Sequence, residues 1–372
     1  MKHTTFFLLA TLACVVGGRG ATALPRNAVG GRGTTALPRN VVGGRGATAL
    51  PRDAALGKRH SCRFNQGEAT RASLPRWSAP LGPAANLPYP AGHILALQIC
   101  LDRRGYSVNA LDGTTGRKTD VALATYCAVN GLPFPTRSQQ AMAWENLFPG
   151  ETNLFTTIIV TPEDRRAIVR IPRAPAEKAA MTAMGYQSLL EMYAERGRLT
   201  EATLRALNPR VRWPNPPVGT IIQIPYFPQP PKKRGTPRVL ADVLRVSLER
   251  REITAFDRKG KLIALFPCSI AAEKNKRPPP GEIEVITLIP DPNYTYTPDA
   301  PGDQRKYIYP PGPNNPVGLA WIGLSLPSYG IHGTPWPEQI GRAESHGCFR
   351  LSNWNAVRLR ELCDIGTSIV IE

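Results

Sequence analysis

The sequence has no long hydrophobic run and none of the common metal-binding motifs. Its most apolar stretch, residues 6–16, is too short to span a bilayer, which takes about 20 apolar residues in a helix. No later segment is apolar enough, and neither a Cys-x-x-Cys nor a His-Glu-x-x-His pattern occurs. We therefore expect no transmembrane segment, no metal and no cofactor.

Acidic residues are also scarce: 28 Asp and Glu stand against 46 Lys and Arg, a net charge of +18. Three 13-residue repeats begin at Val16, Val29 and Val42, and each carries two arginines. The repeats are rich in Gly and Pro with little to bury, so they predict a disordered tail rather than a solenoid. Anionic envelope polymers are candidate partners of this tail, and a solvated spacer is the alternative. Nucleic acid is not expected, because no basic–aromatic module accompanies the charge.

The start of the chain is typical of a secreted protein. Lys2 precedes the apolar run, and the small residues 21–23 fit a signal-peptidase site. We predict a signal peptide over 1–23 and disordered repeats over 24–59, with the mature protein in the periplasm or cell envelope. Cys14, after Leu-Ala, leaves lipid anchoring as an alternative.

A histidine and a cysteine share one short region near the C-terminus. Residues 345–348 read Ser-His-Gly-Cys, and His332 lies upstream. A thiolate is the nucleophilic form of cysteine, and a nearby imidazole can generate it near neutral pH. Gly347 permits a tight turn and close approach of a substrate, and its N–H could face a developing oxyanion. This set predicts acyl transfer through a thioester on Cys348.

These residues resemble the signature of the L,D-transpeptidase catalytic domain, a histidine followed by Ser/Thr-His-Gly-Cys and then Arg or Asn. Residues 277–282, 312–318 and 329–335 also resemble family segments, with Pro279 where threonine is common. The resemblance covers about residues 237–372. It implies a mostly-β domain with one helix after the catalytic cysteine.

The resemblance also implies roles. Cys348 would be the nucleophile and His332 the general base, with the backbone carbonyl of Gly333 orienting the imidazole as a carboxylate does in a Ser-His-Asp triad. The donor would be a peptidoglycan stem peptide that loses D-alanine and passes its acyl group to an amine. Arginine suits a substrate carboxylate because its planar fork binds bidentately. The residues expected to shape the pocket are Ser345, His346, Arg350, Asn353, Tyr329 and Trp336.

Other functions remain open at this stage. An L,D-carboxypeptidase would use the same thioester on Cys348 with water as the acceptor. In a non-catalytic wall-binding protein, Cys348 would be oxidised or buried. The presence of both His332 and Cys348 argues against this alternative. Zinc accepts N and S ligands, but His346 and Cys348 have no further ligand motif beside them.

Two smaller modules are predicted upstream, which makes the chain multidomain α+β. Residues 91–132 show helical spacing and a Leu-Asp-Gly-x-x-Gly-x-x-Thr string, and resemble the small three-helix peptidoglycan-binding domain. Cys127 stands near a position where that family often has Phe-Gln, so wall binding stays open. Residues 179–227 resemble a degenerate LysM-type module, with a helical spacer as the alternative. The remaining segments are predicted as a linker (60–90), a connector (133–178) and a Pro-rich linker (228–236).

Within the C-terminal segment, alternating patterns predict strands and one helix follows the cysteine motif. The long Tyr/Pro/Gly segment between Pro290 and Pro316 has no period, and we predict that it is a flap over the cleft. A disulfide between Cys100 and Cys127 is the first candidate pairing, and Cys62 with either is the alternative. The predicted strands are 239–248, 252–256, 261–266, 282–289, 320–324 and 367–371, and the predicted helix is 353–363.

Overall fold

The computed structural model describes residues 87–88, 90–228, 239–298, 305–341, 343–345 and 347–372. The fold described below belongs to the unit of residues 75–372. The predicted signal peptide, the basic repeats, most of the first linker and almost all of the Pro-rich linker lie outside the described residues, as do Cys14 and Cys62. In the part that is described, no helix has the length and apolar character needed to cross a membrane.

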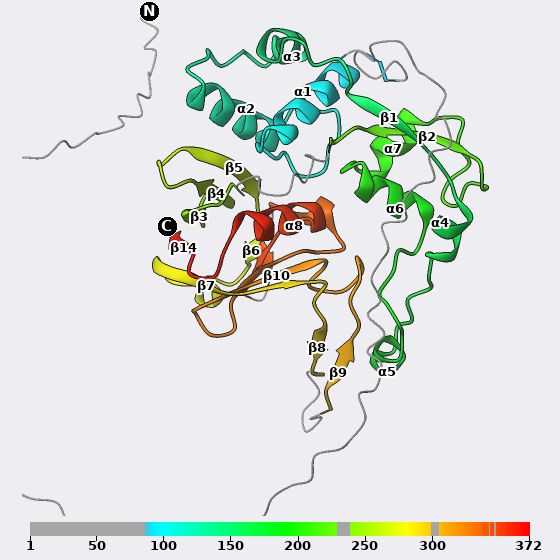
Figure 1. The fold of residues 1–372 in the computed structure, drawn as a ribbon, viewed down its shortest axis with the longest axis vertical. Coiled ribbons are helices and arrows are strands. Elements are labelled where there is room, and N and C mark those ends of the chain that lie inside the picture. Colours follow the sequence, from blue (N-terminus) through cyan, green and yellow to red (C-terminus); the bar gives the residue numbers. More distant parts are fainter. Residues whose placement is uncertain (1–86, 89, 229–238, 299–304, 342, 346) are drawn as a thin grey trace, which may run out of the picture. The chain divides into compact units, whose positions relative to one another are not determined.

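Three helices make up the first module (Figure 1). α1 (Ala91–Arg103) ends just before Gly105, whose φ of 100° favours glycine, and α2 (Arg117–Val129) follows the Asp-Gly turn. Both helices confirm the sequence prediction. The third, α3 (Gln140–Leu147), packs against α1 although it lies in the predicted connector, because Trp144 and the following Phe148 supply large apolar groups to the same core.

A two-stranded antiparallel sheet frames the second module. Its strands are β1 (Phe155–Ile159) and β2 (Ile221–Pro225). The first strand comes from the predicted connector, so the second module of the fold begins earlier than residue 179. Ser188 and Thr200 cap the two principal helices through their side-chain oxygens. The helices in order are α4 (Pro162–Arg166), α5 (Pro175–Ala179), α6 (Leu189–Arg196) and α7 (Glu201–Leu207).

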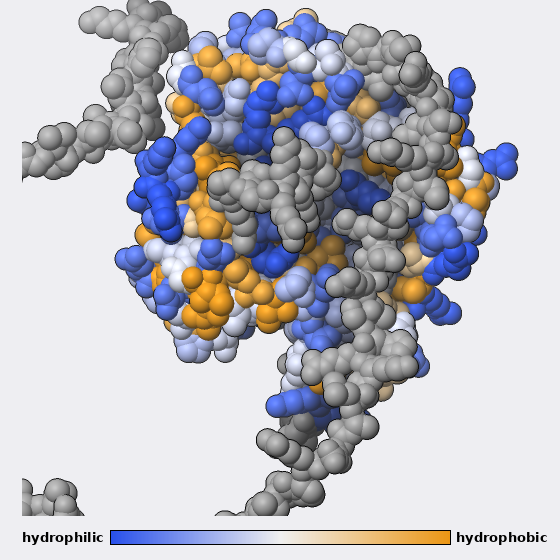
Figure 2. Space-filling view, viewed as in Figure 1, coloured by the Kyte–Doolittle hydropathy of each residue, from blue (hydrophilic) through white to orange (hydrophobic). Residues whose placement is uncertain are grey.

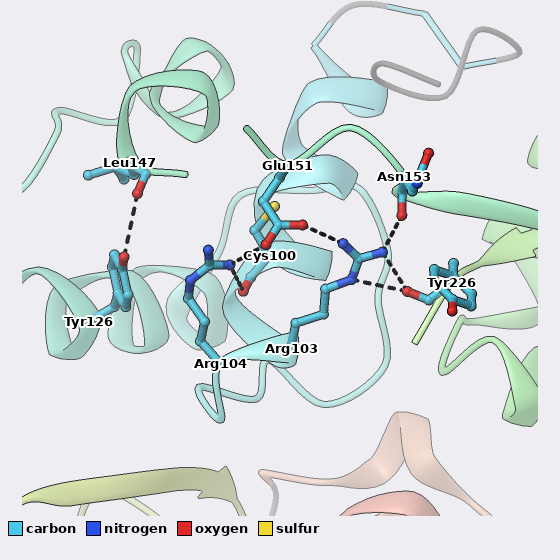
Figure 3. A network of polar contacts seen from close by, with 8 residues as sticks. All are labelled: Cys100, Arg103, Arg104, Tyr126, Leu147, Glu151, Asn153 and Tyr226. Atoms are coloured by element: carbon cyan, nitrogen blue, oxygen red, sulfur yellow. Dashed lines mark hydrogen bonds and ion pairs between the residues drawn. The ribbon is translucent and has the colours of Figure 1, made fainter. Parts of the chain in front are cut away.

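The first two modules share one hydrophobic core rather than two separate ones. An ionic network fastens their junction (Figure 3). Arg103 at the end of α1 pairs with Glu151 and donates to the carbonyl oxygens of Asn153 and Tyr226, the latter at 2.6 Å. Arg104 joins the same carboxylate at 3.1 Å. These contacts link α1 to both the segment after α3 and the end of β2.

The predicted disulfide between Cys100 and Cys127 is wrong, since both are free, buried thiols. They pack among the apolar side chains of the shared core as small hydrophobes. Burial raises the pKa of Cys100 to about 12, so this thiol stays protonated and unreactive. The alternative partner, Cys62, falls outside the described residues.

The C-terminal domain is built on an eight-stranded sheet in the order β13-β11-β10-β7-β14-β3-β4-β5. Each strand predicted from the sequence is confirmed. The helix is also confirmed, as α8 (Asn353–Leu362). The confirmed strands are β3 (Val243–Ser247), β4 (Glu252–Phe256), β5 (Leu262–Pro267), β7 (Gly281–Pro290), β10 (Ala320–Leu324) and β14 (Ser368–Ile371).

Short strands that the sequence analysis missed bring the site together. β11 (Gly330–His332) pairs antiparallel with β10 and parallel with β13 (Phe349–Arg350), which places His332 opposite Arg350. Ile331 and Phe349 point into the second hydrophobic core, so their polar neighbours lie on the other face. The further short strands are β6 (Ile270–Ala271), β8 (Tyr294–Tyr296), β9 (Tyr307–Tyr309) and β12 (Ala343–Ser345).

The predicted flap contains a hairpin of β8 and β9, which extends away from the main sheet (Figure 1). Its tyrosines face one another, and the rings of Tyr296 and Tyr309 stack at 5.7 Å. Figure 2 shows hydrophobic side chains near the region where β7 and β10 lie, and Ile286 and Ile289 of β7 are exposed.

Candidate active site

A cleft of about 670 Å³ contains both residues of the predicted cysteine–histidine pair. Cys348 and His332 line it together with Gly347, Arg350 and Trp336. Both ends of the predicted flap also contribute to the wall. The flap and adjoining residues in the lining are Ile289, Pro292, Asn293, Tyr294, Pro316 and Val317.

His332 is buried and held from two sides. Its Nδ1 lies 2.6 Å from the carbonyl oxygen of Gly333, and the Trp321 ring stacks on the imidazole at 5.6 Å. The carbonyl can only accept, so Nδ1 carries the proton and Nε2 is the free acceptor in the neutral ring. Burial lowers the pKa of His332 to about 4, against the opposing effect of the Gly333 hydrogen bond. The imidazole is therefore neutral at pH 7 and can accept a proton.

Cys348 lies at a turn that only glycine adopts readily, since the preceding Gly347 has a φ of 156°. The thiol is partly exposed and its Sγ lies 3.7 Å from the Ser328 carbonyl oxygen. Burial raises the pKa of Cys348, while a backbone hydrogen bond from Gly330 and the charge of Arg350 oppose this shift. Both members of the pair are thus neutral at rest, which suits proton transfer from thiol to imidazole during attack.

The other predicted site residues divide into two groups. Arg350 and Trp336 line the cleft, and Trp336 is 50% exposed. Tyr329 does not line it; its hydroxyl donates to the Lys276 carbonyl at 3.1 Å. Asn353 is fully buried and is likewise absent from the lining. His346 and the Ser345 side chain lie outside the described part of the structure.

No cluster of three or more His, Cys, Asp or Glu side chains able to hold a metal occurs among the residues that are described. What the cleft offers is a thiol, a neutral imidazole and an arginine among the residues that line it. These are the groups of nucleophilic acyl transfer.

Comparison with known proteins agrees with this chemistry. A family model of the L,D-transpeptidase catalytic domain matches residues 241–371. A Fuscovulum blasticum protein that is named for an inferred L,D-transpeptidase activity is 33% identical over 143 residues. This alignment covers 36% of the present chain and 69% of that protein. The chain belongs to the L,D-transpeptidase family. A similarly named Bacillus licheniformis protein is 27% identical over 182 residues, 49% of this chain and 92% of its own length.

Solved L,D-transpeptidase structures resemble the chain more loosely. The catalytic domain of an E. faecium L,D-transpeptidase acylated by ertapenem has 22% identity and a TM-score of 0.28, covering 36% of this chain and 98% of that one. An L,D-transpeptidase from Mycobacterium smegmatis has 16% identity and a TM-score of 0.29, covering 44% and 76%. The family assignment rests on the sequence matches.

Several cleft residues of this member of the L,D-transpeptidase family were not found by the sequence analysis. Trp321 lies within a predicted strand, but nothing in a strand pattern shows that its ring stacks on a histidine one strand away. Ser328 contributes its backbone carbonyl, a group that every residue has, so the residue type gives no signal of this contact. Pro316 and Val317 lie at or just after the end of the predicted flap, so that prediction did point to this wall of the cleft.

Proposed function

We propose that this protein is a peptidoglycan L,D-transpeptidase that forms a thioester on Cys348. The observation that carries the proposal is the shared cleft, in which the Cys348 thiol and the neutral, oriented imidazole of His332 lie together in a chain of this family. The proposed donor is a tetrapeptide stem ending in a diamino acid and D-alanine.

In the first half-reaction, Cys348 Sγ attacks the carbonyl carbon of the terminal peptide bond while His332 takes the thiol proton. The N–H of Gly347 is the proposed donor to the oxyanion, and Arg350 the proposed partner of a substrate carboxylate. The C–N bond then breaks, and the imidazolium returns its proton to the departing D-alanine amine. In the second half, an acceptor amine attacks the thioester carbonyl carbon and gives a proton to His332. The C–S bond then breaks as the amide forms, and His332 passes the proton to Cys348 Sγ, which regenerates the thiol.

The proposed location is the periplasm or cell envelope, where the substrate is found. The proposed partners are peptidoglycan stem peptides and glycan, and the upstream modules are the proposed wall-binding parts. The basic repeats are proposed to contact anionic envelope polymers, an attraction that falls as salt screens the charges.

The test is mass spectrometry of the purified full chain after incubation with disaccharide-tetrapeptide. We expect a 3→3 cross-linked dimer with release of D-alanine, and no product from Cys348→Ala. Cys127→Ala is the matched control, since it removes a buried thiol of another module and should keep the wild-type product.

Other outcomes would replace the proposal. Tripeptide without dimer would identify an L,D-carboxypeptidase that uses water as the acceptor. No product from a wild-type chain whose Cys348 titrates as a free thiol would favour a non-catalytic wall-binding protein. Unchanged product from Cys348→Ala would exclude the thioester mechanism altogether.

A further inference from the structure

The second module reaches the catalytic domain through one carboxyl group. Glu195 lies near the end of α6, and its Oε2 accepts a hydrogen bond from Asn353 Nδ2 at 2.9 Å. Its Oε1 accepts a second from the Tyr186 hydroxyl, also at 2.9 Å. Both carboxyl oxygens therefore have a partner, and one partner is the first residue of α8, five positions after Cys348.

The buried side chain of Asn353 links separate backbone segments through hydrogen bonds. Its Nδ2 also donates to the Pro313 carbonyl at 3.0 Å, and its Oδ1 accepts from the Leu319 N–H at 3.2 Å. A β-carbon added to Gly318 or Gly333 would collide with this Oδ1. The Asn353 amide thus fills the space between the two glycines, and any shift of the amide would disturb both segments.

Gly333 lies between the Asn353 side chain and the proposed general base, His332. Its carbonyl oxygen lies 2.6 Å from His332 Nδ1, so the position of Gly333 sets the orientation of the imidazole. Contacts therefore run from Glu195 to Asn353, from Asn353 to Gly333 and from Gly333 to His332. The first and last of these contacts are hydrogen bonds, and the middle one is close packing of Asn353 Oδ1 against Gly333. Indirect contacts of this kind hold a reacting group in its productive geometry, and an error of about 1 Å can cost about 100-fold in rate.

The same module also supports one wall of the cleft. The Met184 N–H donates to the Pro311 carbonyl at 2.8 Å, and the Asn314 N–H donates back to the Met184 carbonyl at 2.9 Å. The Asn314 side chain donates to the Gly185 carbonyl at 2.9 Å. Two residues farther along the chain, Pro316 and Val317 line the cleft. The second module thus holds the segment 311–314 at its own surface.

We propose that Glu195, a residue of the second module, is a positioning residue for catalysis: through Asn353 it fixes the Gly333 carbonyl that orients His332. The proposal rests on the proposed L,D-transpeptidase function and assigns a part in it to a module outside the catalytic domain. Glu195 touches neither the substrate cleft lining nor the thiol, so its effect passes through Asn353.

The test compares turnover of three full-length variants with the wild type. We expect Glu195→Ala to lower kcat by about 10- to 100-fold with little change in KM, because base orientation rather than substrate contact is lost. Glu195→Gln should keep most of the activity, since its amide oxygen can accept from Asn353 while its NH₂ donates to the Tyr186 oxygen. Glu201→Ala, which removes an exposed glutamate of α7 in the same module, is the matched control and should behave as wild type.

A reversed pair sharpens the test. Asn353→Asp keeps an oxygen for the Leu319 N–H but removes the donor to Glu195, so kcat should fall. Adding Glu195→Gln to it supplies a donor from the other side, and kcat should recover in part. Equal loss in the single and double variants, or wild-type kcat in Glu195→Ala, would overturn the positioning role. A fall in melting temperature without a change in kcat would do the same.

A second readout separates this proposal from the proposed function. The rate at which iodoacetamide alkylates Cys348 at pH 7, followed on the Cys348 peptide, reports on the His332–Cys348 pair without any substrate. We expect slower alkylation in Glu195→Ala than in Glu195→Gln. If the wild type alkylates normally yet forms no product, the transpeptidase function fails while this difference still supports the positioning role. If the two variants alkylate alike, the positioning role fails whatever the product analysis shows.

Discussion

The proposed base and the proposed nucleophile of this site lie in contrasting surroundings. His332 is buried, stacked on Trp321 and hydrogen-bonded to the adjoining Gly333 carbonyl. Cys348 is partly exposed, at a glycine turn on the wall of the cleft. The proposed base is held by packing, whereas the thiol is open to the cleft.

This difference explains how neutral groups can work as a pair. A buried imidazole with a low pKa pays no desolvation penalty while uncharged, and its orientation is already set before the substrate binds. In the proposed mechanism the thiol needs exposure, because it would form and break a covalent bond in each cycle. Substitutions around His332 should therefore lower both kcat and stability. Substitutions farther along the cleft wall should alter only one of these two quantities.

The largest effect should come from Gly333→Ala. The new methyl group would collide with the Asn353 amide, which has hydrogen bonds on both of its ends and cannot simply rotate away. We expect kcat to fall by about 100-fold and the free energy of unfolding by about 1–3 kcal/mol. Steady-state kinetics and denaturant unfolding measure the two losses.

Gly116→Ala provides the control, since that glycine has extended backbone and open space where its β-carbon would lie. Its kcat should equal that of the wild type. Near-normal kcat in Gly333→Ala would show that the base does not depend on this close contact.

The next effect is the pH dependence of stability. The pKa of His332 falls from 6.5 in the unfolded chain to about 4 in the fold, so the unfolded state binds the proton more readily between these values. The neutral His332 therefore costs no stability above pH 6.5. As the pH falls towards 4, the free energy of unfolding should decrease by about 3 kcal/mol. Unfolding of the wild type and of His332→Gln across pH 4–7 measures it. The variant should show a shallower slope, and identical slopes would contradict a buried neutral imidazole.

The smallest effect should come from Tyr329→Phe. The sequence analysis placed Tyr329 among the substrate-binding residues, but its hydroxyl donates to the Lys276 carbonyl and it does not line the cleft. We expect a loss of about 1 kcal/mol in stability and unchanged kcat and KM. Trp336→Ala is the comparison, because that exposed ring does line the cleft and should raise KM. A raised KM in Tyr329→Phe would show that the Tyr329 hydroxyl does take part in substrate binding.

Prediction from sequence succeeded where a local pattern reflects a local cause. Alternation along β4 and β10 reproduced their bounds, and the Ser-His-Gly-Cys segment located the cleft. It failed for β11 and β13, which are only two or three residues long, too short to show an alternating pattern, and which form because they pair with other strands. It also failed for the Cys100–Cys127 pairing, because residue types do not show which thiols pack side by side in a core.

The sequence by itself determined the family, the longer strands of the catalytic domain and the identity of the candidate nucleophile and base, because each depends on short-range patterns of residue type. Tertiary structure alone decided that α3 and β1 join the upstream core, that Trp321 stacks on His332, and that Glu195 contacts Asn353. Glu195 and Asn353 are 158 residues apart. A contact over such a separation is set by how whole elements pack, and no local pattern records it.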